Sequence, residues 1–191
     1  RQVTMRYARQ WPAITELDAT VNFDRMRLWT ESNSGNSGGI PFRDSKAEFR
    51  DLRDGKLTVS TAGAASLPAL YGYSADSPIR NLFGKVFDIL ELEGNSRYRV
   101  DLTIPLKAVR DFQLDATLAT DDGYLGFSTL PLFAEQIRGE IQLDRKGVYA
   151  EGVLATVFDR PTTLSLSPAG ADSGFGLRMT ADGHVTGTAL V

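Results

Sequence analysis

The stretch Tyr98-Arg99-Val100-Asp101-Leu102-Thr103-Ile104 alternates between apolar and polar side chains without interruption. Successive side chains of a β-strand point to opposite faces of the sheet, so this pattern predicts a strand with one apolar and one polar face. Antiparallel sheets with one covered and one hydrated face show such alternation, whereas buried parallel strands are apolar throughout. The chain is therefore predicted to be mostly β and antiparallel.

The same alternation recurs on both sides of this stretch. It runs through residues 17–23, 112–118 and 140–143. Pairs of residues typical of turns separate the expected strands, namely Asp54-Gly55, Asp122-Gly123, Lys146-Gly147 and Asp182-Gly183. Many strands of this kind predict one or more twisted, curled antiparallel sheets, and the alternative is a closed β-sandwich.

One segment, at about residues 66–90, breaks the alternation and is predicted to be a short two-helix insert. Ser66 is a suitable N-cap for a first helix that opens with Leu67-Pro68 and reaches about Tyr73. Ser77-Pro78 opens a second helix, whose apolar residues at helical spacing are Ile79, Leu82, Phe83, Val86 and Phe87. We expect the insert to lie across an apolar sheet face or to cap one end of the sheet.

The chain also resembles itself at a shift of about 120 positions. Residues 11–63 then fall on residues 131–183 without a gap, and Asp24-Arg25 falls on Asp144-Arg145. We predict one β-rich domain over residues 1–191, as a fragment of a longer protein. Within it, repeat unit 1 covers about 11–63, the insert about 66–90, the central strands about 96–127 and repeat unit 2 about 131–183.

Composition excludes several classes of function. The net charge of −3 gives no broad positive field, so nucleic acid is not an expected partner. The chain has no cysteine, which excludes disulfides and thiolate chemistry. No apolar run reaches the roughly 18 residues that a membrane-spanning helix needs.

Candidate catalytic groups are isolated in the sequence. His184 is the only histidine, and it is expected at the surface or on an edge strand. The segment 33–39 is rich in Ser and Gly but lacks the lysine of a phosphate-binding loop, so a flexible hairpin loop is predicted there. Dispersed aromatics such as Trp11 and Trp29 are expected in the core. We therefore expect no catalytic residue, no metal site and no cofactor, and an enzyme that acts on carbohydrate is a distant alternative.

The apolar strand faces remain as the candidate functional feature. In a compact sandwich they are buried against a second sheet, whereas in a curled sheet they can line a groove that acyl chains contact. Alternation is the same in both cases, so the pattern leaves this choice open.

The order of these elements resembles the YhdP family of the AsmA-like superfamily of Gram-negative envelope proteins. The motifs that carry the resemblance extend over most of the chain. They are the opening from Trp11-Pro12 to Phe23, Gly39-Ile40-Pro41, the hairpin from Asp51-Leu52 to Leu57-Thr58-Val59, Ser77-Pro78-Ile79, the strand end Leu102-Thr103-Ile104-Pro105-Leu106, and a second opening from Leu130-Pro131-Leu132 to Gly139-Glu140-Ile141-Gln142-Leu143.

This resemblance implies a periplasmic segment of a protein anchored in the inner membrane through parts absent from this fragment. It implies a non-enzymatic role in phospholipid transport to the outer membrane and in maintaining the envelope barrier. The partners would be phospholipid acyl chains and neighbouring domains of the same chain. The expected groove lining is one apolar strand face, with the candidates Val21, Phe23, Val100, Leu102, Ile104, Leu114, Leu118, Ile141 and Leu143. The alternative is a structural or protein-interaction β module that does not bind lipid.

Overall fold

The computed structural model describes residues 3–6, 8, 10–169 and 177–183, and they form one antiparallel sheet with a helical insert. The strands are β1 (Val3–Met5), β2 (Ile14–Asp24), β3 (Arg27–Ser37), β4 (Ile40–Phe49), β5 (Lys56–Ser66), β6 (Leu90–Glu93), β7 (Asn95–Pro105), β8 (Gln113–Phe127), β9 (Leu130–Asp144), β10 (Gly147–Val157), β11 (Arg160–Pro168) and β12 (Leu177–Asp182). The mostly antiparallel β fold predicted from alternation is confirmed.

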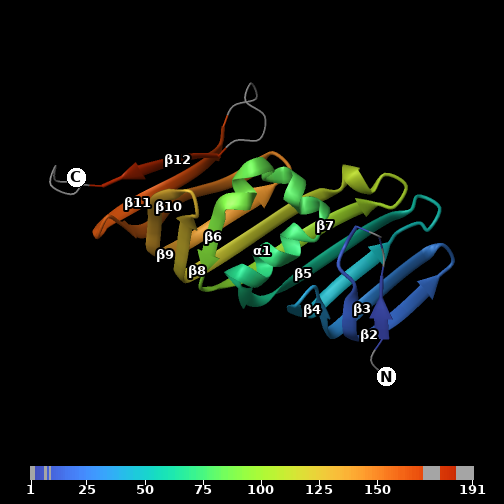
Figure 1. The fold of residues 1–191 in the computed structure, drawn as a ribbon. Coiled ribbons are helices and arrows are strands. Elements are labelled where there is room, and N and C mark those ends of the chain that lie inside the picture. The colour runs from blue at the N-terminus through green and yellow to red at the C-terminus, as the bar shows by residue number, and fades with distance from the viewer. Residues whose placement is uncertain (1–2, 7, 9, 170–176, 184–191) are drawn as a thin grey trace.

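The sheet is open. Its strands follow the order β1-β2-β3-β4-β5-β7-β8-β9-β10-β11-β12, so neighbours in the chain are almost always neighbours in the sheet. Figure 1 shows this progression from the blue N-terminal strands to the orange and red C-terminal strands. No second sheet packs against the first among the described residues, and the closed sandwich, kept as an alternative above, is wrong.

The short strand β6 lies off this path. It pairs with residues 124–127 at the far end of β8, while β7 pairs with residues 113–120 of the same strand. Between β6 and β7 lies Gly94, whose φ of 102° is unfavourable for a residue with a side chain. A Cβ atom there would lie 2.4 Å from the carbonyl oxygen of Asp122, which requires a glycine at this position. Since β6 and β7 both pair with β8, they act as one strand that bends at Gly94.

The helical insert is confirmed in place but differs in detail from the prediction. It comprises α1 (Leu67–Ala75) and two 3-10 helices, η1 (Pro78–Leu82) and η2 (Gly84–Ile89). The Ser66 hydroxyl accepts a hydrogen bond from Ala69 N at 3.3 Å, as an N-cap does. The second helix is present as two 3-10 segments: Arg80 N and Phe83 N bond to carbonyls three residues back, the pattern of a 3-10 helix.

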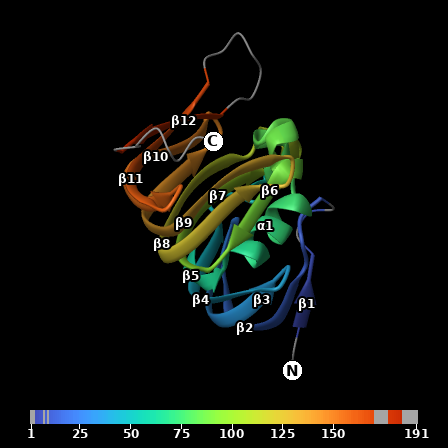
Figure 2. The same cartoon turned by 60° about the vertical axis from the view of Figure 1, so that its left-hand side comes forward.

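Figure 2 shows the sheet curving, with α1 on its hollow side. We call the sheet face on which the insert lies the inner face, and the opposite one the outer face. The main apolar cluster joins the insert to this inner face. Its buried members are Trp11, Leu57, Ile79, Leu82, Leu102, Ile104, Phe112, Leu114 and Ala116.

Two turn predictions are wrong because the strands are longer than expected. Asp122-Gly123 lies inside β8, where the register shifts between Thr120 and Leu125 in a bulge and no hairpin forms. The segment 33–39 is not a flexible loop, since β3 continues to Ser37 and Gly38 and Gly39 alone make the turn. The prediction for His184 lies outside the described residues.

The strand pairing repeats along the chain. β9 and β10 pair Asp144 with Gly147 and Glu135 with Thr156, and β2 and β3 pair Asp24 with Arg27 and Thr15 with Asn36. Each member of the second set lies 120 positions before its counterpart, since 144 − 24 = 120. The hairpin turns match as well: Gly38 and Gly39 have positive φ angles, as do Phe158 and Asp159. The register therefore recurs at the shift found in the sequence, whereas the bounds of the repeat units stay a prediction.

Within the described part of the chain, the helices are too short and too polar for any of them to cross a bilayer.

Candidate functional site

The strand register places all nine candidate residues on the inner face. Directly opposed residues of neighbouring strands face the same side of a sheet. One row runs from Val21 through Thr30, Ala47 and Val59 to Leu102 and Leu114. The next row runs from Phe23 through Leu28, Phe49 and Leu57 to Ile104.

The other candidates lie on the same strands or on β9. Val100 is opposite Ala116, which is opposite Leu143, and Leu118 is opposite Ile141. The candidates are thus spread over β2, β7, β8 and β9 rather than gathered at one point. They outline a broad apolar surface, as a binding face for hydrocarbon would.

The candidates differ in exposure, in three classes. Leu102, Ile104 and Leu114 are buried, and Ile104 is 0% exposed. At the β2 end of the sheet, Val21 is 51% and Phe23 is 67% exposed. Val100, Leu118, Ile141 and Leu143 are half-buried. Only the margins of the candidate face are therefore accessible in this structure.

The insert covers the centre of the inner face. Its residues Ile79 and Leu82 are buried in the same cluster as Leu102 and Ile104, and Tyr73 and Phe83 pack against that cluster. The insert also has contacts within itself. The rings of Tyr71 and Phe87 stack with centroids 4.2 Å apart.

Two polar contacts strengthen this internal packing. The Tyr71 hydroxyl donates to the carbonyl oxygen of Phe87 at 2.5 Å, and Arg80 Nη2 lies 2.6 Å from Asp88 Oδ1. These links join α1 to η2 and η1 to η2, so the insert is braced as one unit that rests on the sheet through apolar contacts.

Sequence reasoning missed a second apolar cluster on the inner face. Its buried members are Ala134, Ile137, Val153, Ala155 and Leu164, from β9, β10 and β11. Alternation does not reveal this cluster because bulges interrupt it: Gln136 has a φ of 52° and Gly152 a φ of 66°. At the 120-residue shift Ala134 and Ile137 fall on the apolar residues Ile14 and Leu17, whereas the three members from β10 and β11 fall on Asn33, Gly35 and Asp44, so the repeat indicates only the part of the cluster on β9.

Tyr98 is a polar group within the inner face. Its hydroxyl donates to the carbonyl oxygen of Pro41 at 2.8 Å. A Cβ atom at Gly63, directly opposite on β5, would lie 2.7 Å from the same hydroxyl oxygen, so the tyrosine ring requires a glycine there. Burial raises the pKa of Tyr98 above its ordinary value, and the nearby Tyr73 raises it further.

The outer face is polar and its charges are mixed. Arg97, Arg99 and Asp101 on β7 are exposed, as predicted for a hydrated face. Asp101 is directly opposite Asp115, which is directly opposite Asp144. We call these three carboxylates the acidic row. In the part of the chain that the structure describes, no three acidic or histidine residues are placed to hold a metal ion.

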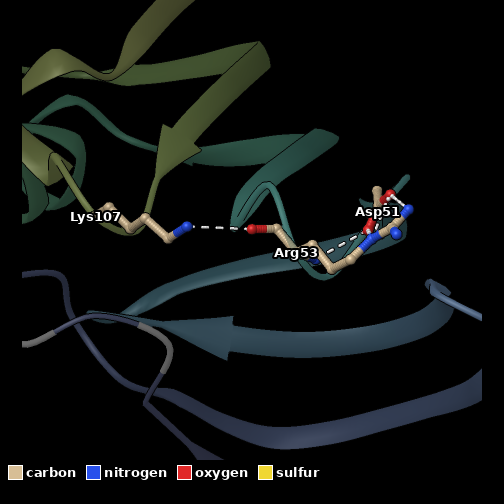
Figure 3. Close-up of polar contacts among 3 residues, drawn as sticks. All are labelled: Asp51, Arg53 and Lys107. Atoms are coloured by element: carbon tan, nitrogen blue, oxygen red, sulfur yellow. Dashed lines mark hydrogen bonds and ion pairs between the residues drawn. The ribbon is translucent and has the colours of Figure 1, made fainter.

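At one end of the sheet, polar contacts join the β4–β5 turn to the β7–β8 turn. Lys107 Nζ donates to the Arg53 carbonyl oxygen at 3.2 Å, and the Arg53 guanidinium pairs with the Asp51 carboxylate, as Figure 3 shows. The guanidinium, with a backbone N–H of Arg53, lowers the pKa of Asp51 to about 2. Both groups are at the surface, so this contact orders the turn rather than forming a reactive site.

Two surface hollows lie near this end of the sheet. One, of about 660 Å³, is lined by Ala8, Gln10, Leu106, Ala108, Val109, Arg110 and Asp111. The other, of about 600 Å³, is lined by Gln10, Ala75, Asp76, Ser77, Pro78, Asn81 and Arg110. Neither is lined by any of the nine candidates. The inner face is thus a curved surface with a covered centre, and the role of its residues as a groove lining stays a prediction.

Comparison with known proteins gives two matches. The family model described as YhdP protein matches residues 1–191. A curated protein of Escherichia coli strain K12, named intermembrane phospholipid transporter YhdP, is 23% identical over 174 residues. That match covers 87% of this chain and 13% of the relative, so the chain spans a small part of the relative's length. No solved structure matches the chain. Because the family model covers the whole chain, the chain belongs to the YhdP family.

Proposed function

We propose that this segment provides part of an apolar surface along which phospholipid moves between the inner and outer membranes. The single observation that carries the proposal is the continuity of the inner face. Apolar residues from β2 to β11 share this face of an open sheet, and no second sheet covers it among the described residues. The relative's name, which describes a phospholipid transporter, supports the same class of substrate.

The proposed mechanism is non-enzymatic. Acyl chains would lie against the inner face and gain free energy because apolar surface leaves water, at about 25 cal/mol per Å². The charged outer face would stay in water. In this proposal the segment is periplasmic, belongs to a protein anchored in the inner membrane by other parts, and helps to maintain the envelope barrier.

A photocrosslinking experiment tests the proposal. In the full-length protein in living cells, a photoreactive benzoyl-phenylalanine replaces Phe23 or, separately, Leu118, both on the inner face. The matched controls are Asn22 and Thr117, which are the adjacent residues and face outward. We expect phospholipid adducts at Phe23 and Leu118 and few at the controls.

Equal phospholipid labelling of both faces would contradict a lipid-specific inner face. Adducts with protein alone at Phe23 and Leu118 would favour the second candidate, a structural or protein-interaction module. One observation supports that alternative: the insert fills the centre of the face, so Leu102, Ile104 and Leu114 already have protein partners.

A further inference from the structure

Three parts of the chain that are distant in sequence meet at the end of the sheet where the two surface hollows lie. They are the connection from β1 to β2, the turn from β7 to β8, and the junction of α1 with η1. Each is anchored by a residue buried in the main apolar cluster, namely Trp11, Phe112 and Ile79. The rings of Trp11 and Phe112 also meet edge to face, with centroids 5.5 Å apart. The polar residues next to these anchors therefore have a fixed place around the hollows.

The two hollows share a polar wall, and the larger one has an apolar floor. Gln10 and Arg110 line both hollows. Ala8 and Val109 line the larger hollow and also pack against the main apolar cluster. The volumes of the hollows, about 660 Å³ and 600 Å³, are within the range of about 300–1,000 Å³ that is usual for small-molecule sites. An amphiphilic ligand would find a polar wall and, beside it, an apolar floor that is continuous with the core of the inner face.

Arg110 is a cation with unused hydrogen-bond donors. It is exposed, and among the described residues it has neither an ion pair nor a hydrogen bond. Other surface arginines, such as Arg27, Arg53 and Arg80, each pair with a carboxylate. The amide of Gln10 likewise has no partner in the part of the chain that the structure describes. A guanidinium with free donors matches the oxygens of a phosphate, which it can bind in a bidentate way.

The smaller hollow has a negative side as well. Asp76 lines it, is exposed and is the C-cap of α1. The C-terminal end of a helix carries the negative end of the helix dipole, so the Asp76 carboxylate and the helix end both favour a cation there. Asp111 lines the larger hollow beside Arg110. With two carboxylates and one guanidinium, the lining does not suit a ligand that is only an anion.

We propose that the two hollows together bind the zwitterionic headgroup of a phospholipid, a proposal that rests on the proposed function for the class of ligand. The phosphate binds Arg110 and Gln10, and a primary ammonium group, which has three donors, binds the Asp76 carboxylate. The acyl chains pass over Ala8 and Val109 towards the inner face. Charge complementarity selects this ligand, because an anionic headgroup would face Asp76 unpaired and a simple cation would face Arg110.

Photocrosslinking of the purified full-length protein in detergent tests the site. Benzoyl-phenylalanine replaces Ala108 in the larger hollow or Asn81 in the smaller one, and both residues are exposed. A third position, Leu118, reports on the inner face. The protein is irradiated in mixed micelles that contain equal amounts of phosphatidylethanolamine, which has the ammonium group, and phosphatidylglycerol, which shares the phosphate and lacks the ammonium. Mass spectrometry then measures the adducts of each lipid.

We expect phosphatidylethanolamine adducts to exceed phosphatidylglycerol adducts at least about fivefold at Ala108 and Asn81. Arg110→Gln should lower the total lipid adducts at both positions about tenfold, because it removes the charged donor to the phosphate. Asp76→Asn should bring the two lipids to nearly equal yields while phosphatidylglycerol adducts remain. Arg97→Gln, at an exposed arginine of the outer face, is the matched control and should change neither the yield nor the preference.

Competition distinguishes a lipid headgroup from a free phosphate ion. Glycerophosphoethanolamine, which is the headgroup without acyl chains, should reduce the adducts at Ala108 and Asn81, whereas inorganic phosphate at the same concentration should not. Competition by inorganic phosphate alone would assign the site to a free anion and overturn the proposal. Equal yields of the two lipids in the unmodified protein, or a yield that Arg110→Gln leaves unchanged, would also overturn it.

The same experiment separates this site from the proposed path along the inner face. Adducts at Leu118 without adducts at Ala108 and Asn81 would reject the headgroup site and leave the path intact. Adducts at the two hollows that depend on Arg110, with none at Leu118 or Phe23, would reject the path and support the headgroup site. Adducts at Leu118 that persist in Arg110→Gln and Asp76→Asn show that these variants still fold.

Discussion

Truncating one buried and one exposed residue of the inner face should have very different effects on stability. Ile104 is 0% exposed and belongs to the main apolar cluster, so Ile104→Ala leaves a cavity under the insert. Truncation of a buried isoleucine to alanine costs 2–5 kcal/mol, and full burial places this variant at about 4 kcal/mol. Phe23 is 67% exposed, so Phe23→Ala should lose about a third of the usual 3–5 kcal/mol, or roughly 1.3 kcal/mol.

Urea unfolding of residues 1–191, followed by tryptophan fluorescence, measures both values. Trp11 is 2% exposed and lies in the same cluster as Ile104, so its emission reports loss of the core. With a slope of about 2 kcal/mol per M, the midpoint should fall by roughly 2 M for Ile104→Ala and by roughly 0.6 M for Phe23→Ala. Ile104→Val is the control for a smaller cavity, with a loss of about 1 kcal/mol. Equal shifts for Ile104→Ala and Phe23→Ala would refute the division of the inner face into a covered centre and an accessible margin.

Four further variants test polar contacts and close packing. Asp51→Asn should reduce the loss of stability on acidification between about pH 4 and pH 2. The pKa of Asp51 is near 2 in the folded protein, so its carboxylate stabilises the fold at pH values above its ordinary pKa, and this contribution is lost as the pH falls towards 2. Thermal melts across that range measure the effect, and equal acid sensitivity of the variant and the unmodified protein would contradict it. The melting temperature of Tyr98→Phe should depend less on pH above about 10. The pKa of Tyr98 is raised in the fold, so the tyrosine of the unfolded chain ionises first and the fold loses stability as the pH rises. Unchanged alkaline sensitivity would show that Tyr98 ionises freely in the fold. Asp115→Asn should stabilise the fold by up to about 1 kcal/mol at low salt and by less at high salt, because it removes the repulsion of the central carboxylate in the acidic row by its two neighbours. A destabilised variant in urea unfolding would mean that this carboxylate has a favourable partner. Gly63→Ala should lower stability by about 1–3 kcal/mol in urea, because the Tyr98 ring must move; a neutral result would show that the ring has room to shift.

The alternation of apolar and polar residues predicted the central strands correctly because the side chains of a regular strand point to the two faces of the sheet in turn. In 98–104, 19–23 and 114–118 each apolar side chain has an inward position, and no register shift falls within these stretches. The central strands and the shared face of the nine candidates follow from that pattern alone. Where the backbone inserts a residue, as at Gln136 and Gly152, the alternation loses its phase, and the second apolar cluster was not predictable from it.

Local turn and helix signals predicted less of the structure, because contacts with distant parts of the chain decide which local conformation forms. Asp122-Gly123 resembles a hairpin turn, but β6 on one side and β9 on the other hold this part of β8 extended. The apolar residues of 79–87 suit an α-helix, yet Ile79 and Leu82, three residues apart, also share a face of a 3-10 helix, and the contacts with the sheet decide between them. The exposure of the face could not be predicted either, since it depends on where the insert lies.

The chain leaves the sheet and returns to it at the same pair of residues. Ser66, the last residue of β5, is directly opposite Asn95, the first of β7, so residues 67–94 form an excursion from what is otherwise a plain hairpin. In topological terms the insert and β6 are removable: a two-residue connection between Ser66 and Asn95 would preserve every pair of β5 with β7. Lengthening or shortening such an excursion changes the closure entropy of the hairpin only slowly with its length. The architecture can therefore acquire, lose or exchange the element that covers Leu102, Ile104 and Leu114 while the strand order of the sheet stays the same.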